Sequence, residues 1–243
     1  MKILAVALLC ASAFAQSPLG DSSQVLVVKT KNWDAISGTA QRYERQNGRW
    51  RRIGKPSKVA VGGTGLAWGI GFYDFGQQPG PTKKEGDGKS PAGIFKLTAL
   101  FSADESARRY AHMPYISLTP TTECVDDANS ASYNRIVDTG VPKLAPASKD
   151  WNSSEHMLRR DDLYDFGAYV AHNANPPRPG AGSCVFVHVL GALAKAYGTA
   201  GCTALPEDDV VQLFGWLDEK KDPVMVQLPE KEYKSFKKKL SLP

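Results

Sequence analysis

The segment Gly180–Pro206 reads GAGSCVFVHVLGALAKAYGTAGCTALP and is central to the predicted fold. Its alternating apolar residues predict a buried strand over Cys184–Leu190, with His188 on the same face as Cys184. A Gly/Ala-rich connection leads from that strand to Cys202, which lies in a tight glycine turn. A histidine held on a strand and a cysteine in a later glycine turn are candidates for a general base and a thiol nucleophile.

Strand patterns lie on both sides of this segment. The predicted strands are Gln24–Lys29, Ala40–Gln46, Trp50–Ile53, Lys58–Val61, Ile94–Leu97, Phe166–His172 and Pro223–Pro229. Asn47-Gly48 is a strong type I′ hairpin signal between two of them. Helical patterns are few, so the sequence predicts a single mainly β domain, a β-sandwich or partly closed barrel with one or two short helices.

One predicted helix begins at Pro206, directly after the cysteine turn, and runs to about Glu219. Its apolar residues recur at helical spacing, so one stripe is expected to pack on the sheet and anchor the turn. The stripe consists of Val210, Leu213, Phe214 and Leu217. Ala103–Ala111, with acidic residues first and arginines later, is a second short helix candidate.

The chain begins with a pattern typical of secretory signals. Residues 1–15 contain one lysine, a short apolar run and an Ala-Phe-Ala site, which predicts a cleaved signal peptide and a location in the periplasm or cell envelope. A membrane anchor needs about 20 apolar residues, more than this run offers. Cys10 raises a lipoprotein signal as an alternative, which the bulky Leu9 before it disfavours.

The expected organisation is therefore a signal peptide, a catalytic domain over residues 16–229 and a basic, solvated tail over residues 230–243. Removal of Lys2 with the signal lowers the formal net charge from +5 to +4, which is too small to identify a partner. No nucleic-acid motif and no second apolar stretch of membrane length are found in the sequence.

Three cysteines remain after signal removal, and an odd number outside the cytoplasm leaves one unpaired within the molecule. Along a strand, Cys184 would lie roughly 13 Å from His188, at about 3.3 Å per residue. A Cys202 that reaches His188 would then not reach Cys184, because bridged Cα atoms lie within about 7 Å. The sequence predicts a Cys124–Cys184 disulfide and a free Cys202; three merely buried cysteines are the alternative.

Two motifs carry a resemblance to a known family. The histidine and the Thr199–Cys202 turn resemble the His and Ser/Thr-x-Gly-Cys residues of L,D-transpeptidases of the YkuD type. Asp87–Phe95 is similar to the D-x-x-[ST]-P-x-G-x-[FY] stretch of the same family. Ala200 stands where the family commonly has histidine, and Thr203-Ala204 replaces an Ile/Val-Arg pair, so the resemblance is to a divergent branch.

The resemblance implies a β fold without a cofactor or metal, and peptidoglycan stem peptides as partners of a monomer. It also implies a chemistry. Cys202, deprotonated by His188, would attack the amide after the L-centre of a diaminopimelate residue, expel D-alanine and form a thioester. An amine from another stem would then give a cross-link, whereas water would give a hydrolytic carboxypeptidase or endopeptidase.

Further residues receive roles in this hypothesis. The main-chain N–H groups of Gly201 and Cys202 are expected to stabilise the oxyanion, and Thr199 to orient His188. The remaining expectations concern substrate binding, for which the candidates are Ser90, Glu155 and His156. The alternative for Ser90 is a role in the turn that enters the next strand, and for Glu155 and His156 it is a surface turn.

Two other function classes stay open. One is a non-catalytic module that binds the cell wall. The other is a redox or metal protein, because three aspartates (Asp126, Asp127 and Asp138) lie near several histidines (His112, His156 and His172), although no two of these histidines have zinc-motif spacing. Four aromatic residues, Trp33, Tyr43, Trp50 and Trp68, are expected to pack in the core instead of forming a sugar-stacking platform.

Overall fold

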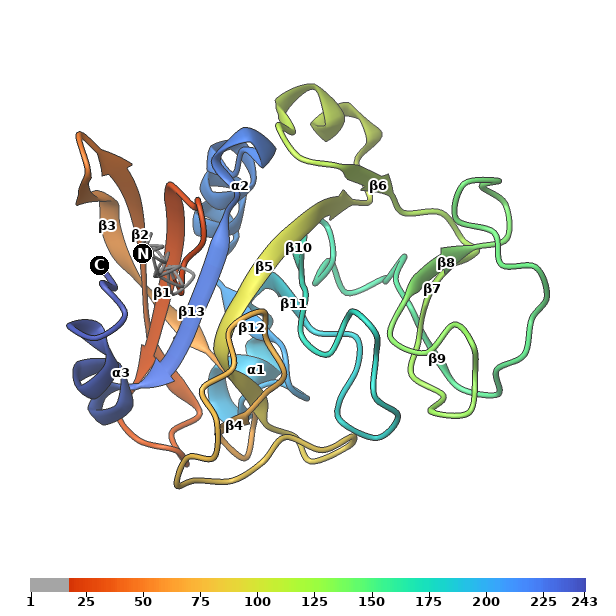
Figure 1. Cartoon of the computed structure of the whole chain (residues 1–243). Coiled ribbons are helices and arrows are strands. Elements are labelled where there is room, and N and C mark those ends of the chain that lie inside the picture. The colour runs from red at the N-terminus through yellow and green to blue at the C-terminus, as the bar shows by residue number, and fades with distance from the viewer. Residues whose placement is uncertain (1–17) are drawn as a thin grey trace, which may run out of the picture.

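The computed structural model describes residues 18–243 (Figure 1), so the signal peptide predicted at residues 1–15 lies outside the described part. The fold is mainly β, as predicted, with a large sheet that closes on itself and a small separate sheet. The strands of the large sheet are β1 (Gln24–Thr30), β2 (Ser37–Gln46), β3 (Arg49–Ala60), β4 (Leu66–Trp68), β5 (Ser90–Ser102), β6 (Tyr115–Ser117), β10 (Gly167–Val170), β11 (Phe186–Val189), β12 (Thr203–Leu205) and β13 (Val224–Pro229).

Eight of these strands form a closed ring. Their order is β10-β11-β12-β3-β2-β1-β13-β5, and β5 pairs with β10 to close it. β1 and β13 are parallel neighbours in this ring, with Val25 opposite Val224, and both strands are almost wholly buried. The closed, barrel-like sandwich encloses the main apolar core, so the predicted architecture is confirmed.

The long β2–β3 hairpin confirms the turn prediction. Asn47 and Gly48 have φ values of 50° and 74°, the left-handed backbone that a type I′ turn requires. The two strands predicted after this turn are one continuous strand, β3, which follows β2 with a register shift between Ala40 and Arg42. At its far end Ala60 pairs with Ala204, so the hairpin reaches the strand that follows Cys202.

A three-stranded sheet, β8-β7-β9, stands beside the main sheet and was not expected from the sequence (Figure 1). It consists of β7 (Thr122–Val125), β8 (Ile136–Asp138) and β9 (Ser154–His156). Asp138 accepts hydrogen bonds here from the hydroxyls of Thr119, Thr121 and Thr122. Burial disfavours the charged form, yet these hydrogen bonds outweigh it and lower the pKa of Asp138 to about 2. The Asp138 carboxylate therefore holds residues 119–122, at the start of β7, in place.

The other two aspartates of the metal hypothesis, Asp126 and Asp127, lie in a loop. Asp127 accepts hydrogen bonds from the backbone N–H groups of Asn129 and Asn152. Within residues 18–243, no group of three His, Cys, Asp or Glu side chains is placed to hold a metal ion.

Helices cover the outside of the sheet. α2 (Glu207–Trp216) buries Val210, Leu213 and Phe214 of the predicted stripe, and Leu217 is buried just beyond the helix, which ends before the predicted Glu219. α1 (Ala192–Tyr197) joins β11 to β12, and α3 (Glu230–Lys237) follows β13. The segment Ala103–Ala111 contains a short 3-10 helix, η1 (Glu105–Tyr110), and a second one, η2 (Glu219–Lys221), precedes β13. None of the helices in the described range is long and apolar enough to cross a membrane.

The basic tail is not simply solvated, contrary to expectation. Tyr233 on α3 is buried, and Leu240 and Leu242 beyond it are buried as well. The expectation failed because lysines dominate the composition, whereas the few apolar residues between them are spaced to face the sheet. The four aromatic residues considered as a sugar platform are only partly exposed and pack against the main core, as expected.

Candidate active site

Two neighbouring parallel strands position the histidine and the cysteine. His188 on β11 is paired with Ala204 on β12, and Cys202 directly precedes β12. The predicted strand over Cys184–Leu190 is shorter than expected, because β11 begins at Phe186. Cys184 has a φ of 53°, a left-handed conformation that cannot belong to a strand.

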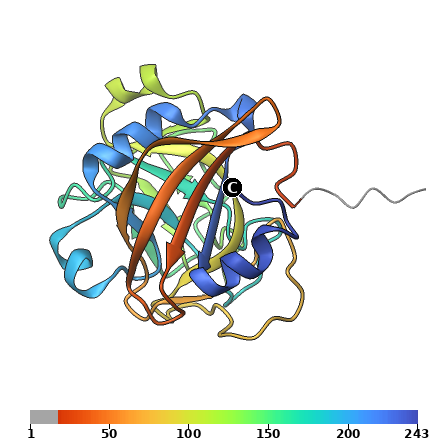
Figure 2. The same cartoon turned by 90° about the vertical axis from the view of Figure 1, so that its left-hand side faces the viewer.

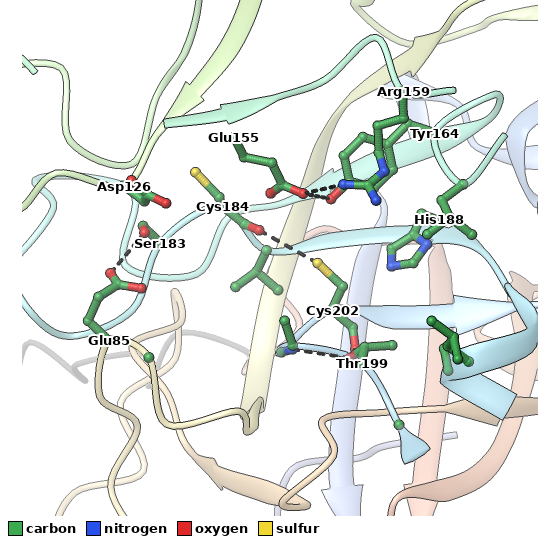
Figure 3. Close-up of a pocket in the computed structure, with 18 of the residues that line it drawn as sticks. Glu85, Asp126, Glu155, Arg159, Tyr164, Ser183, Cys184, His188, Thr199 and Cys202 are labelled. Carbon is green, nitrogen blue, oxygen red and sulfur yellow. Dashed lines mark hydrogen bonds and ion pairs between the residues drawn. The ribbon is translucent and has the colours of Figure 1, made fainter. Parts of the chain in front are cut away.

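A cavity of about 390 Å³ opens beside these strands, within the size range of small-molecule sites (Figure 3). It brings together His188, Cys202 and the Thr199–Gly201 turn, together with Glu155 from β9. The remaining wall is formed by residues from several loops, with α1 at the rim: Lys83, Glu85, Gly86, Asp126, Arg159, Leu163, Tyr164, Ser183, Cys184, Val185, Leu193, Ala194 and Gly198.

The Cys202 thiol is free and partly buried. Its sulfur accepts a hydrogen bond from the Phe186 backbone N–H at 3.3 Å and donates one to the Cys184 carbonyl oxygen at 3.6 Å. Burial raises the pKa of this thiol to about 12, and the Glu155 carboxylate contributes in the same direction. At neutral pH the sulfur is therefore protonated before substrate binds.

His188 is buried, with 5% of its surface exposed. Its Nδ1 lies 2.8 Å from the Val189 carbonyl oxygen, which can only accept, so Nδ1 carries the proton and Nε2 is left with a lone pair. Burial lowers the pKa of the imidazole to about 4, so it is neutral at pH 7. The resting pair is a thiol and a neutral imidazole.

The two groups line the same cavity, and Figure 3 shows them entering it from adjacent elements. The structure records no hydrogen bond between Cys202 Sγ and His188, and the thiol proton points to Cys184 instead. Contacts of this kind are often long in unliganded enzymes and tighten in the substrate complex. A nucleophilic attack by this sulfur would require proton transfer to His188 Nε2 in the same step, because neither the thiolate nor the imidazolium is favoured beforehand.

Two hydroxyls hold the turn that carries the cysteine. Ser90 Oγ and Thr199 Oγ1 both donate to the Cys202 carbonyl oxygen, at 2.8 Å and 2.6 Å. Thr199 Oγ1 also accepts from the Gly201 N–H at 3.1 Å. Gly201 has a φ of 151°, and a Cβ there would lie 3.1 Å from the Lys89 carbonyl oxygen, so the turn favours glycine.

These contacts correct two expectations. The Gly201 N–H is occupied by Thr199 and so is not free to bind an oxyanion in this conformation. Thr199 does not orient His188, because its hydroxyl holds the turn and its carbonyl accepts from Gly63. The group that orients the imidazole is the Val189 carbonyl. Sequence reasoning missed this because any residue could supply that carbonyl.

Ser90 has a supporting role in the structure and does not line the cavity, so it is not placed to bind substrate there. It is fully buried beneath the turn, outside the cavity lining, and its Oγ accepts from the Gly62 N–H at 2.8 Å. Its contacts make it a positioning residue for Cys202. The Ser90-Pro91 motif therefore supports the cysteine turn through the Ser90 hydroxyl.

Replacing Ser90 by alanine is expected to lower the kcat of any Cys202-dependent reaction with little change in KM, because one of the two hydroxyl hydrogen bonds to the Cys202 carbonyl oxygen is lost. The unpaired Gly62 N–H should also cost roughly 1–3 kcal/mol of stability. Ser102→Ala is the matched control, because Ser102 lies on the same strand and is equally buried. Its hydroxyl donates to the Asp165 carbonyl and accepts from the Asp104 N–H, and neither residue lines the cavity. Urea unfolding and steady-state kinetics of both variants give the comparison; an equal kcat loss in both would contradict the positioning role.

Glu155, as expected, lines the cavity, and it has partners that the sequence did not suggest. The Tyr164 hydroxyl donates to Glu155 Oε1 at 2.6 Å, and Arg159 Nη1 lies 3.5 Å from the same oxygen. Burial raises the pKa of the Glu155 carboxyl, although both neighbours oppose the shift. Arg159 is itself held by Asp161. Arg159 and Tyr164 lie in an irregular loop, where no periodicity could have marked them.

His156 does not line the cavity, so that expectation is wrong. It follows Glu155 on β9, and successive strand residues point to opposite faces. Its side chain is exposed, and Nδ1 lies 3.7 Å from Glu123 Oε1.

The Cys124–Cys184 disulfide is present, with the two Cα atoms 5.9 Å apart. The pairing confirms the prediction, but the distance argument behind it fails. Cys202 does lie beside Cys184, because the bend at Cys184 replaces the straight strand assumed. Cys124 pairs with Glu155 across β7 and β9, so the disulfide fastens the small sheet, and with it one cavity wall, to the segment entering β11.

Comparison with known families gives a match over most of the chain. The YkuD model, described as the L,D-transpeptidase catalytic domain, matches residues 34–226. This range contains Cys202, His188 and every other residue of the cavity lining. Comparisons with curated proteins and with solved structures give no match.

Proposed function

The chain belongs to the L,D-transpeptidase catalytic-domain family of the YkuD type, and from this premise we propose that it is an exported cysteine acyl transferase that cross-links peptidoglycan stem peptides. Membership indicates an L,D-transpeptidase-type activity that modifies peptidoglycan. The observation that carries the cysteine mechanism is one cavity that holds a free thiol, Cys202, and a neutral imidazole, His188, with an unprotonated Nε2.

In the first step, Cys202 Sγ attacks the carbonyl carbon of the amide that follows the L-centre of the diaminopimelate residue. The thiol proton passes to His188 Nε2, and the imidazolium returns it to the departing nitrogen of D-alanine. The carbon–nitrogen bond breaks and a carbon–sulfur bond forms, so the product is a thioester on Cys202. The Val189 carbonyl keeps the imidazole in the required tautomer throughout.

In the second step, an amine of a neighbouring stem attacks the thioester, and His188 accepts the proton that the amine loses. Sulfur leaves as the thiol once that proton returns to it, and a new amide joins the two stems. Water in place of the amine gives the shortened stem, which is hydrolysis. The same cavity and the same two residues serve both outcomes, so the acceptor decides between cross-linking and hydrolysis.

The substrate carboxylate needs a cation, and the residues after Cys202 do not provide one. Thr203 bonds to Gln227 inside the core, and Ala204 is fully buried. Arg159 and Lys83 are the cations that line the cavity, and both already contact carboxylates of the protein. This arrangement supports hydrolysis as the second candidate, since a weakly held stem leaves room for water.

We place this activity outside the cytoplasm. Residues 1–15 match a secretory signal, and the Cys124–Cys184 disulfide is of the kind that persists in oxidising compartments. The test is fractionation of cells that produce the full chain. The proposal requires a mature protein in the extracytoplasmic fraction with its N-terminus near Gln16, and the uncleaved chain in the cytoplasm would contradict it.

The function itself is tested by product analysis. Purified disaccharide tetrapeptide is incubated with the protein, with and without an amine acceptor, and the products are separated by mass. Cross-linked dimer with release of D-alanine supports transfer, whereas shortened monomer alone supports hydrolysis. Neither product should form with the Cys202→Ala variant. Unchanged substrate with the parent protein would contradict the proposed activity and favour a non-catalytic module that binds the cell wall.

A further inference from the structure

Positive charge is concentrated on the β2–β3 hairpin. Residues 42–58 contain seven Lys and Arg residues and one Glu, a net charge of +6, whereas the whole chain carries +5. The rest of the chain is therefore net −1. The seven cations are Arg42, Arg45, Arg49, Arg51, Arg52, Lys55 and Lys58. They are called the basic hairpin below.

Most of these charges have no acidic partner within residues 18–243 of the protein; Arg42, which lies near Asp209, is the exception. None of the seven takes part in an ion pair among the described residues. The hairpin's one acidic residue, Glu44, forms its ion pair with Lys221, which lies outside the hairpin. Arg42 bonds to Gln212, while the five cations from Arg49 onward are exposed. A surface of this kind favours a partner that supplies negative charge.

The hairpin is a ribbon with cations on both faces. Arg51 lies opposite Glu44, and the next pair, Arg52 opposite Tyr43, points to the other face. Figure 2 shows the two strands, in orange, in front of the rest of the molecule, with their turn at its edge. A partner that follows the ribbon meets cations along it whichever face it approaches.

The surface is suited to a hydrated polyanion. Among the residues that the structure describes, the large exposed hydrophobic side chains lie elsewhere (Phe72, Tyr110, Leu158, Leu193, Tyr197 and Val211), and the hairpin's Trp50 is only partly exposed. A bilayer-inserting surface or a stable protein interface would need apolar groups in the patch. Electrostatic attraction without apolar contact fits a charged polymer.

The tip of the basic hairpin, which carries Arg49, Arg51 and Arg52, lies away from the cavity. Arg49 precedes Ala60 by eleven residues along β3, roughly 36 Å at about 3.3 Å per residue. Ala60 pairs with Ala204, two residues after Cys202. A single stem peptide in the cavity therefore cannot also reach the tip of the hairpin, but a polymer that carries many stems can.

We propose that the basic hairpin binds the peptidoglycan polymer through the carboxylates of its stem peptides, at a site distinct from the cavity; the choice of this polymer rests on the proposed function. The partner is a carboxylate-rich polyanion. Binding is by charge, so it weakens as salt rises, with screening over about 10 Å at 0.1 M ionic strength. The hairpin concentrates the enzyme on the polymer and leaves the cavity free for one stem.

The test is co-sedimentation with insoluble peptidoglycan, in a Cys202→Ala background so that no turnover occurs. The hairpin variant is Arg49→Gln/Arg51→Gln/Arg52→Gln. The matched control is Lys143→Gln/Arg160→Gln/Arg178→Gln, which removes the same charge at three exposed residues without ion pairs. The hairpin variant should bind roughly tenfold more weakly at low salt, and the control within about twofold of the parent. The parent should bind polymer whose carboxylates have been converted to amides as weakly as the hairpin variant binds the untreated polymer.

Three results would overturn the proposal: equal binding by the hairpin and control variants, binding that survives amidation of the polymer, or stronger retention on phosphatidylglycerol vesicles than on peptidoglycan. The assay needs no catalysis, so loss of the proposed enzyme function would leave its outcome unaffected. With Cys202 intact, the hairpin variant should keep the parent's rate on soluble disaccharide tetrapeptide and lose rate on the polymer alone.

Discussion

Replacing His188 by glutamine is expected to slow acyl-enzyme formation by roughly 10²–10⁴-fold, the usual contribution of a positioned general base. The effect is large because burial keeps the Cys202 thiol protonated, with a pKa of about 12, so the sulfur depends on a neighbouring acceptor for its proton. Rapid-quench measurement of the acyl adduct gives the rate. His172→Gln is the matched control, since His172 is also buried and also has its pKa lowered to about 4 by burial.

The pH dependence follows from the same group. A pKa lowered to about 4 means that the His188 imidazole loses its proton at lower pH than usual, so the base form persists down to about pH 4. The acylation rate should therefore fall on the acidic side near pH 4. A fall near pH 6.5, the usual range of histidine, or an unchanged rate in His188→Gln would contradict the assigned role.

Removing the Cys124–Cys184 disulfide is expected to give the largest loss of stability. The cysteines are 60 residues apart in sequence, and closing a loop of that size is worth about 4 kcal/mol in the chain-entropy model. The Cys124→Ala/Cys184→Ala variant should show this loss in urea unfolding. It should also lose activity, because β9 carries Glu155 into the cavity from the sheet that the bond fastens.

Reduction of the parent protein provides the control for that variant. Dithiothreitol should lower the unfolding midpoint of the parent and leave the double variant unchanged, since Cys202 has no disulfide to lose. A parent whose midpoint and activity are insensitive to reduction would show that the small sheet is held without the bond.

Regular features of the fold could be predicted from the sequence because they rest on local pattern. The apolar β-branched run of β1 and the Asn47-Gly48 turn each favour their own conformation, and the apolar stripe of α2 does the same. The small β8-β7-β9 sheet could not be predicted, since its strands are three or four residues long and are held by a disulfide and by Asp138.

Within the candidate site, residue types that carry their own chemistry were found and their contacts were not. Cys202 and His188 share a cavity because parallel strands bring them together. The Val189 carbonyl and the bend at Cys184 are backbone features without a sequence signature. Ser90 was identified by its motif as a substrate-binding candidate, but it supports the Cys202 turn. A motif does not distinguish a residue that lines the cavity from one that holds a lining residue in place.

The most direct test of the account is the intact mass of the protein after brief incubation with disaccharide tetrapeptide, followed by peptide mapping. We expect a mass gain equal to the donor minus D-alanine, located on Cys202 and absent from Cys202→Ala. An adduct on another residue, an adduct that persists in Cys202→Ala, or turnover without any adduct would contradict it.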